Sequence, residues 1–244
     1  IDTSHPIDVY VSAGNSGDGS ENHPYPVACQ ADLEAVNNDL AANYLMTTDI
    51  YFNSDFHYDK AVIAPDANKA NNVFDGTAFT GSFDGNQHTI SNLTIDTHLV
   101  SNDYLALFGL IETSARIENL AMRTCTVRES KIIMYSPQTD ADRVGSLCGF
   151  NKGIIRDCSS TGSVIIADNC VGALCGKNNG TIEAAHTTGR VNGGGATGGL
   201  LGINNGTVTD SSGVTILSGS QIIGGLSGSN DGLIRSSYAA GRIL

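Results

Sequence analysis

The sequence predicts an all-β fold of the parallel β-helix (solenoid) type with a short N-terminal capping helix. The first observation is a repeat, because the pattern Gly-x-Leu-x-Gly-x-Asn-x-Gly occurs four times, beginning at Gly145, Gly172, Gly198 and Gly224. The second is the glycine content, 29 of 244 residues, which disfavours helical repeats because glycine costs ~1 kcal/mol inside a helix. Short apolar runs separated by glycine corners are typical of coils of about three short strands, stacked in parallel on their neighbours.

Residues 1–78 are predicted to form an N-terminal cap and the first irregular coils. Residues 7–11, Ile-Asp-Val-Tyr-Val, alternate between apolar and polar side chains as a strand does. Residues 53–78 interrupt the repeat with a proline and several Asn and Asp residues. We expect this segment to be a loop excursion on the side of the solenoid.

A helix is predicted between residues 31 and 43. Leu33, Val36 and Leu40 recur there at helical spacing, which suits an amphipathic helix lying on a β surface. Cys29 and Gln30 are not the usual capping residues, so the sequence does not define the first residue of the helix. Since the first coil of a solenoid would expose unpaired strand groups, we expect the helix to cover that edge.

Residues 79–244 are predicted to be the repeats of one continuous domain. Strand alternation places the leucine, the flanking glycine and the asparagine of each copy on one face. The leucines should then form an internal stack and the asparagines a ladder in which each buried amide hydrogen-bonds its neighbour. The last glycine of each copy is expected to supply the positive φ of a turn. These structural roles fall on Leu147, Leu174, Leu200, Leu226, Asn151, Asn178, Asn204, Asn230, Gly153, Gly180, Gly206 and Gly232.

The six cysteines form no Cys-x-x-Cys pair, which argues against a structural zinc site. Cys148 and Cys175 occupy the same place in successive copies. A parallel register would put their Cα atoms roughly 4.8 Å apart, within the ~4.4 to 6.8 Å range of disulfides. We expect the two cysteines to be in contact on the face opposite the leucines. This spacing is compatible with a disulfide and with two free thiols.

The formal net charge of −12 argues against a nucleic-acid or anionic-membrane partner, because both need a basic surface. No apolar run approaches the ~18 residues of a membrane span. Residues 1–103 hold 15 acidic residues against Lys60 and Lys69, whereas residues 104–244 hold 10 acidic and 11 basic residues. We interpret the acidic part as a solvated face that keeps an extracellular protein soluble, with a cation-binding or salt-tolerant surface as the alternative.

A weak calcium hypothesis concerns residues 15–21, which carry the hard oxygen ligands that calcium prefers. Asp18 and Glu21 are the candidate ligands. The segment lacks the EF-hand pattern, so no cofactor is predicted beyond this calcium candidate.

The four copies resemble the GLUG motif, a repeat of bacterial surface proteins that include adhesin-like chains and the non-catalytic regions of IgA-cleaving metallopeptidases. Residues 79–95 are similar to the segment that precedes such repeats, with Gln87 where a glycine usually stands. Residues 17–25, 31–43 and 48–50 are similar to the usual start of such domains, so the resemblance covers most of the chain. It implies a right-handed parallel β-helix on the outside of bacteria and specifies no reaction.

An enzyme is the less favoured interpretation. Polysaccharide-cleaving β-helices need two carboxylates ~5 to 9 Å apart or a calcium-bound acidic cluster. Asp157 is followed at the equivalent position by Ala184 and only then by Asp210, which leaves no adjacent acidic pair there. A more acidic stretch is interpreted as a solvated loop and contains Asp49, Asp55, His57, Asp59 and Asp66. No His-Glu-x-x-His occurs, so the chain is not a peptidase of that type, and no catalytic residue is predicted.

We therefore expect a non-catalytic β-helix module of an adhesin-like protein, extracellular or at the cell surface, whose flat face and loops bind a glycan or a protein. A structural spacer or filament subunit and a carbohydrate-active enzyme are the alternatives. Leu244 follows the last repeat step with no capping segment, so we also expect further chain, a partner or self-association at the C-terminal edge.

Overall fold

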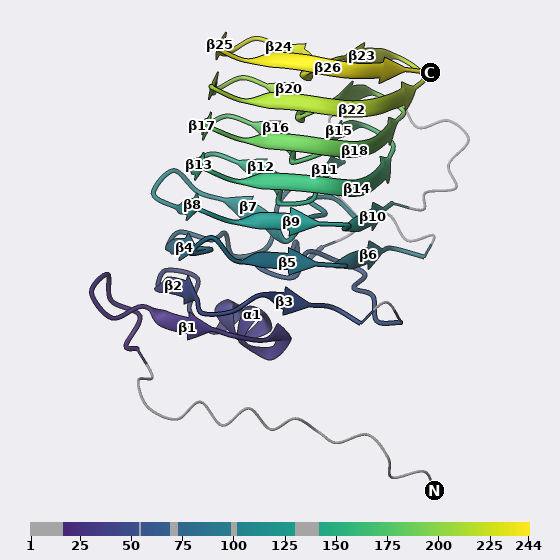
Figure 1. Cartoon of the computed structure of the whole chain (residues 1–244). Helices are drawn as coiled ribbons and strands as arrows, with labels where there is room; N and C mark the ends of the chain where they lie inside the picture. Colours follow the sequence, from purple (N-terminus) through teal and green to yellow (C-terminus); the bar gives the residue numbers. More distant parts are fainter. Residues whose placement is uncertain (1–16, 54, 69–72, 99–101, 130–141) are drawn as a thin grey trace, which may run out of the picture.

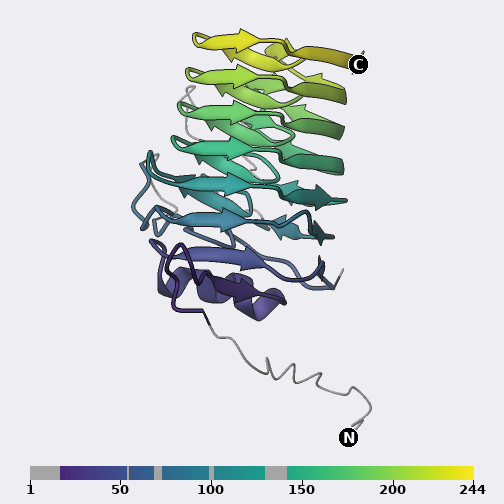
Figure 2. The same cartoon turned by 60° about the vertical axis from the view of Figure 1, so that its left-hand side comes forward.

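The structure, a computed structural model, describes residues 17–53, 55–68, 73–98, 102–129 and 142–244. The chain winds into coils that stack from the N-terminal end toward the C-terminal end (Figures 1 and 2). Every pairing between the named strands in these residues is parallel. The predicted parallel β-helix is confirmed, whereas the strand predicted at 7–11 lies outside the described residues.

Four sheets run along the stack of the described coils. The eight-stranded sheet contains β1 (Tyr25–Val27), β2 (Asn43–Met46), β4 (Ser82–Asp84), β8 (Arg116–Glu118), β13 (Ile154–Arg156), β17 (Thr181–Glu183), β21 (Thr207–Thr209) and β25 (Leu233–Arg235). The nine-stranded sheet contains β3 (Ile50–Tyr51), β5 (Thr89–Ser91), β6 (Thr94–Asp96), β9 (Ala121–Arg123), β10 (Thr126–Arg128), β14 (Ser159–Ala167), β18 (His186–Gly193), β22 (Ser212–Gly219) and β26 (Tyr238–Ile243).

The two smaller sheets close each coil. The four-stranded sheet contains β11 (Arg143–Val144), β15 (Cys170–Gly172), β19 (Ala196–Gly198) and β23 (Ile222–Gly224). The five-stranded sheet contains β7 (Phe108–Ile111), β12 (Cys148–Asn151), β16 (Cys175–Asn178), β20 (Leu201–Asn204) and β24 (Ser227–Asn230). One coil thus visits the five-, eight-, nine- and four-stranded sheets in turn, as β12 to β15 do.

The core is built from several stacks of aligned apolar side chains, and successive coils contribute to each stack. The eight-stranded sheet turns Ile117, Ile155, Ile182 and Val208 inward, and all four are fully buried. Of the repeat leucines, Leu147, Leu174 and Leu200 are fully buried and Leu226 is half-buried. The expected separation of these leucines from the cysteines is wrong, because Cys148 and Cys175 are fully buried too. The leucines lie in the corner just before β12 and β16, so strand alternation does not apply to them.

The predicted role of the repeat glycines is also wrong. Gly153, Gly180, Gly206 and Gly232 are not among the residues with positive φ. The left-handed positions lie instead at the corner between the eight- and nine-stranded sheets, at Asp157, Ala184, Asp210 and Ser236, with φ of 47 to 50°. The repeat glycines are needed for close approach, because a Cβ on Gly180 would lie 2.1 Å from the carbonyl oxygen of Gly153.

The N-terminal helix is shorter than predicted. Helix α1 (Gln30–Ala35) continues as the 3-10 turn η1 (Val36–Asn38) and lies at the N-terminal end of the stack (Figure 1). Leu33 and Val36 are fully buried against the first coils, as their spacing suggests. Asp32 defines the start, because its carboxylate accepts hydrogen bonds from the backbone N–H groups of residues 28 and 29.

Residues 53–78 are only in part the loop that the sequence predicts. Asn37 ties this segment to the cap, since its Nδ2 donates to the Val62 carbonyl and its Oδ1 accepts from the Ala64 N–H. Ile63 forms a parallel bridge with Phe108 and is fully buried. The segment therefore adds apolar side chains to the core, although many of its residues are polar.

Candidate functional site

The repeat asparagines form a continuous hydrogen-bonded ladder inside the corner. The Nδ2 of Asn151 donates to Oδ1 of Asn178 at 2.8 Å, Asn178 donates to Asn204 at 2.8 Å, and Asn204 donates to Asn230 at 2.7 Å. Each Oδ1 of the first three also accepts from a backbone N–H two residues later, at Gly153, Gly180 or Gly206. The first three side chains are fully buried. A ladder whose groups bond within the stack positions the corner and leaves little capacity for a ligand.

Cys148 and Cys175 are aligned neighbours on β12 and β16, and both are free thiols in the structure. The Sγ of Cys175 donates a hydrogen bond to the carbonyl oxygen of Lys177 at 3.0 Å. Burial, followed by the hydrogen bond to Cys175, raises the pKa of the Cys148 thiol well above its usual value. The disulfide that the register allowed is therefore not formed.

The calcium candidates lie in a small hairpin. Asp18 and Gly19 donate their backbone N–H groups to the carbonyl oxygen of His23, and Oδ1 of Asp18 accepts from the Ser20 N–H at 3.0 Å. Hydrogen bonding from Ser20 lowers the pKa of the Asp18 carboxyl. Across the described ranges, no group of three or more His, Cys, Asp or Glu side chains could hold a metal ion.

A polar groove of about 610 Å³ lies on the outer face of the eight-stranded sheet, over β2, β4 and β8. Its size is in the range of small-molecule sites. Hydroxyl, amide, carboxylate and guanidinium groups line it, contributed by Glu21, Asn43, Thr80, Ser82, Asp84, Ser114, Arg116 and Glu118. Such groups pair with the hydroxyls of a sugar.

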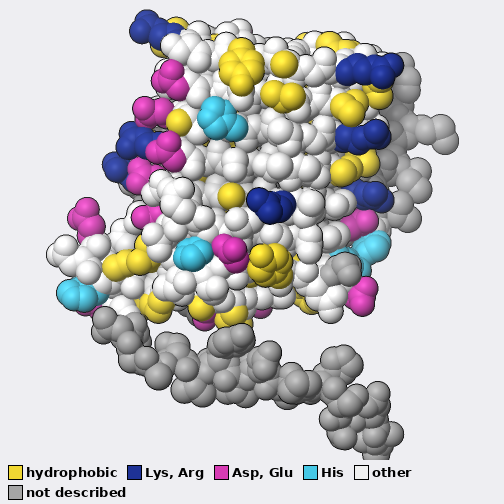
Figure 3. All heavy atoms as spheres, viewed as in Figure 1, with side chains coloured by type: hydrophobic (Ala, Val, Ile, Leu, Met, Phe, Trp, Pro, Cys, Tyr) yellow, Lys and Arg dark blue, Asp and Glu magenta, His cyan; other side chains and the backbone are white. Residues whose placement is uncertain are grey.

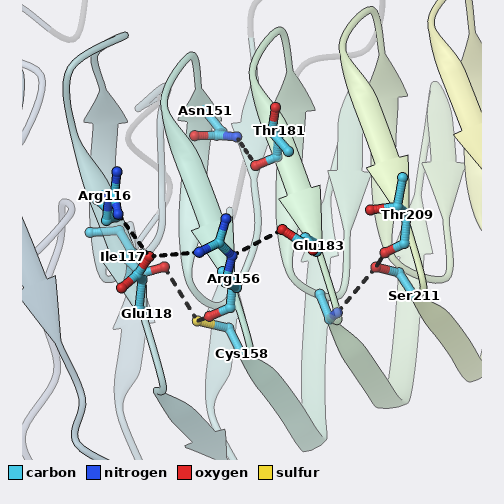
Figure 4. Close-up of polar contacts among 11 residues, drawn as sticks. Arg116, Ile117, Glu118, Asn151, Arg156, Cys158, Thr181, Glu183, Thr209 and Ser211 are labelled. Atoms are coloured by element: carbon cyan, nitrogen blue, oxygen red, sulfur yellow. Dashed lines mark hydrogen bonds and ion pairs between the residues drawn. The ribbon is translucent and has the colours of Figure 1, made fainter.

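Alternating charges continue from this groove along the same sheet (Figure 4). Glu118 lies between two arginines, 3.5 Å from Arg116 and 3.6 Å from Arg156. The Nε of Arg156 donates to Glu183 at 2.9 Å, which raises the pKa of the Arg156 guanidinium. These residues occupy β8, β13 and β17, so the row of charged side chains extends the polar surface across three successive coils.

The groove contains a carboxylate pair that the sequence analysis missed. Asp84 on β4 and Glu118 on β8 are aligned neighbours in adjacent coils. They are 34 residues apart in the sequence, not 26 or 27, so the repeat spacing did not align them. Asp84 accepts hydrogen bonds from the Asn86 N–H at 2.7 Å and from Nδ2 of Asn119 at 2.9 Å.

The acidic residues that the sequence singled out do not come together. Asp49 binds the Thr89 N–H at 2.9 Å and His88, and these bonds lower the pKa of its carboxyl. Asp66 is buried and accepts from the Asp75 N–H at 2.8 Å. His57 instead contacts another histidine, with its Nε2 2.6 Å from Nε2 of His98.

Comparison with known proteins identifies the repeat. The family described as the GLUG motif matches residues 140–165, which contain the first copy and β12 and β13. The chain carries the GLUG motif. The three later copies repeat it in register along β16, β20 and β24.

Halomucin of Haloquadratum walsbyi is 33% identical to this chain over 160 residues, which is 63% of the chain and 2% of Halomucin. The crystal structure of a Bacteroides ovatus protein described as an immunoglobulin A1 protease has a similar fold, with a TM-score of 0.55 at 15% identity. That similarity covers 93% of this chain and 79% of the other. None of the helices in the described part of the chain has the length and apolar character that crossing a bilayer requires.

Proposed function

We propose that this chain is a non-catalytic, extracellular β-helix module of a surface protein, and that it binds a glycan in the polar groove over β2, β4 and β8. The GLUG motif at residues 140–165, which resembles a repeat of bacterial surface proteins, supports this location. The observation that carries the binding proposal is the groove itself, about 610 Å³ of space lined by hydroxyl, amide and charged side chains.

The chemistry of the groove favours a polyhydroxylated ligand. Ser82 and Asn43 lie on neighbouring strands and hydrogen-bond each other, so the groove floor is ordered before a ligand arrives. Arg116 has a half-exposed side chain that can donate hydrogen bonds into the groove. An ordered floor reduces the entropy lost on binding.

Screening the whole chain on a glycan array, followed by calorimetry with the best neutral oligosaccharide, tests the proposal. Arg116→Ala removes a groove donor and should weaken binding about tenfold, the effect of losing roughly 1.4 kcal/mol. Arg235→Ala removes an exposed arginine of the same sheet outside the groove and should leave affinity unchanged. If no glycan binds, or if both variants lose affinity equally, the groove is not a glycan site and the spacer or filament function gains support.

A carbohydrate-active enzyme is the second candidate, because Asp84 and Glu118 face the groove from adjacent coils. Adjacent parallel strands are about 4.8 Å apart, so two carboxylates there can reach the ~5 to 9 Å separation that glycoside hydrolysis uses. Incubation with the glycans that bind, with detection of new reducing ends, separates the candidates. Cleavage that both Asp84→Asn and Glu118→Gln abolish would replace the non-catalytic proposal.

A further inference from the structure

The outer face of the nine-stranded sheet has a charge opposite to that of the whole protein. Its strands carry four arginines and one carboxylate, namely Arg123, Arg128, Arg190, Arg242 and Asp96. The chain as a whole has 13 basic and 25 acidic residues. All four arginines lie in residues 104–244, the part of the chain that is nearly balanced in charge. An anionic partner would therefore meet a locally basic surface.

Two of these arginines occupy one row of the sheet, in alternate coils. The register runs from Val164 on β14 through Arg190 on β18 and Ile216 on β22 to Arg242 on β26. Adjacent strands are about 4.8 Å apart, so the two arginine positions are separated by roughly 10 Å with an aliphatic side chain between them. Figure 3 shows cationic and hydrophobic side chains alternating along this edge of the face. We call this row the arginine row.

The arginines of this row are available to a ligand. Arg190 and Arg242 are exposed, and no carboxylate of the described residues forms an ion pair with either of them. Val164 and Ile216 are half-buried, so each leaves a small apolar surface beside an arginine. Arg128 extends the basic surface in the neighbouring row, where it aligns with Asp96.

We propose that the arginine row binds a carboxylated polysaccharide, a linear chain of uronic acid residues. The planar guanidinium forms two parallel hydrogen bonds with a carboxylate, which a neutral sugar cannot offer. In an extended polyuronate, carboxylates on one side of the chain recur about once per disaccharide, a length similar to the arginine separation. The apolar face of the sugar ring between the two carboxylates then packs on Ile216, and the ring on the other side of Arg190 packs on Val164.

Other polyanions fit this row less well. A nucleic-acid strand places a phosphate every 3.4 Å or so along the axis, so most of its charges would find no arginine. An acidic polypeptide has the right charge but lacks rings that could cover the aliphatic side chains. The arginine row lies on a different sheet from the polar groove, so each site can fail without the other.

The test measures binding of polygalacturonate to the whole chain at low salt, with neutral dextran and polyglutamate as comparison polymers. The double variant Arg190→Gln/Arg242→Gln should weaken polygalacturonate binding about tenfold, corresponding to two exposed ion pairs. The matched control Lys177→Gln/Arg235→Gln removes the same charge from the other sheets and should change affinity less than about twofold.

A charge-preserving swap tests the spacing. Arg190→Ile/Ile216→Arg keeps the net charge and moves one arginine directly beside Arg242. We expect the swap to weaken polygalacturonate binding several-fold while unfolding at an unchanged temperature. Equal binding of polyglutamate or dextran, equal loss in the control, or full affinity in the swap would each overturn the proposal.

Discussion

At the residue scale, the asparagine ladder explains why one side chain recurs in every copy. Asn178 accepts from Asn151 and from the Gly180 N–H, and it donates to Asn204. The planar amide group both donates and accepts, so each asparagine can hydrogen-bond to the asparagine of the coil before it and of the coil after it. Asn178→Ala would leave these buried groups without partners and should lower the free energy of unfolding by about 2 to 4 kcal/mol.

The neighbouring Asn179 provides the control, because it is exposed at the same corner. Asn179→Ala should change the free energy of unfolding by less than about 0.5 kcal/mol. Urea denaturation of both variants measures the difference. Equal midpoints would mean that the ladder contributes little to stability.

The cysteines allow a second prediction at this scale. Burial raises the pKa of the thiols of Cys125 and Cys158 to about 12, and it raises the pKa of Cys148 as well. The thiolate is the reactive form, so these groups stay protonated and unreactive at neutral pH. Of the six cysteines, Cys29 is half-buried and the other five are buried.

We therefore expect a thiol reagent such as DTNB to modify one cysteine, Cys29, in the native protein and all six after denaturation. Cys29→Ser should abolish the native reaction. Rapid native modification of Cys148 or Cys175 would contradict the burial of β12 and β16.

At the element scale, the glycines show how closely successive coils approach. A Cβ at Gly180 would lie 2.1 Å from the carbonyl oxygen of Gly153, an obstacle made of backbone that cannot rotate away. Gly162 differs, because its φ is +68° and an added Cβ would meet only Thr124 at 3.6 Å. Gly162→Ala should therefore cost about 1 to 2 kcal/mol, the price of a left-handed alanine.

Gly180→Ala should cost more than Gly162→Ala, because two coils must separate locally to admit the methyl group. Thermal unfolding of the two variants gives the comparison. A Gly180→Ala variant as stable as Gly162→Ala would indicate that neighbouring coils can move apart at this corner with little loss of stability.

The repeat spacing predicted the elements that recur without insertions and failed where they do not. Leu147, Leu174 and Leu200 follow one another at 26 or 27 residues, and the sequence located their stack. Asp84 and Glu118 lie in coils of a different length, so their alignment required the structure. The φ of the repeat glycines was assigned wrongly because positive φ and close approach both select glycine, and sequence alone cannot separate the two causes.

At the scale of the whole molecule, a parallel stack is held together by contacts between neighbouring coils, so stability should vary along its axis. Strand β18 pairs with β14 on one side and β22 on the other, whereas among the described strands β26 pairs with β22 alone. Leu217 on β22 is buried, whereas Ile243, its partner on β26, is 58% exposed. The inner coils therefore have two apolar interfaces and the coil of β26 has one.

Hydrogen exchange on this 244-residue chain should show that gradient. The amides of β26 are expected to exchange at least about tenfold faster than those of β18, because opening β26 breaks one interface and opening β18 breaks two. At the other end of the stack the cap packs Leu33 and Val36 against the first coils, so β2 should be more protected than β25. If β18 and β26 shared a single exchange rate, the coils would open together as one cooperative unit. The expected gradient would then be wrong, because it assumes that each coil is stabilised only by its nearest neighbours.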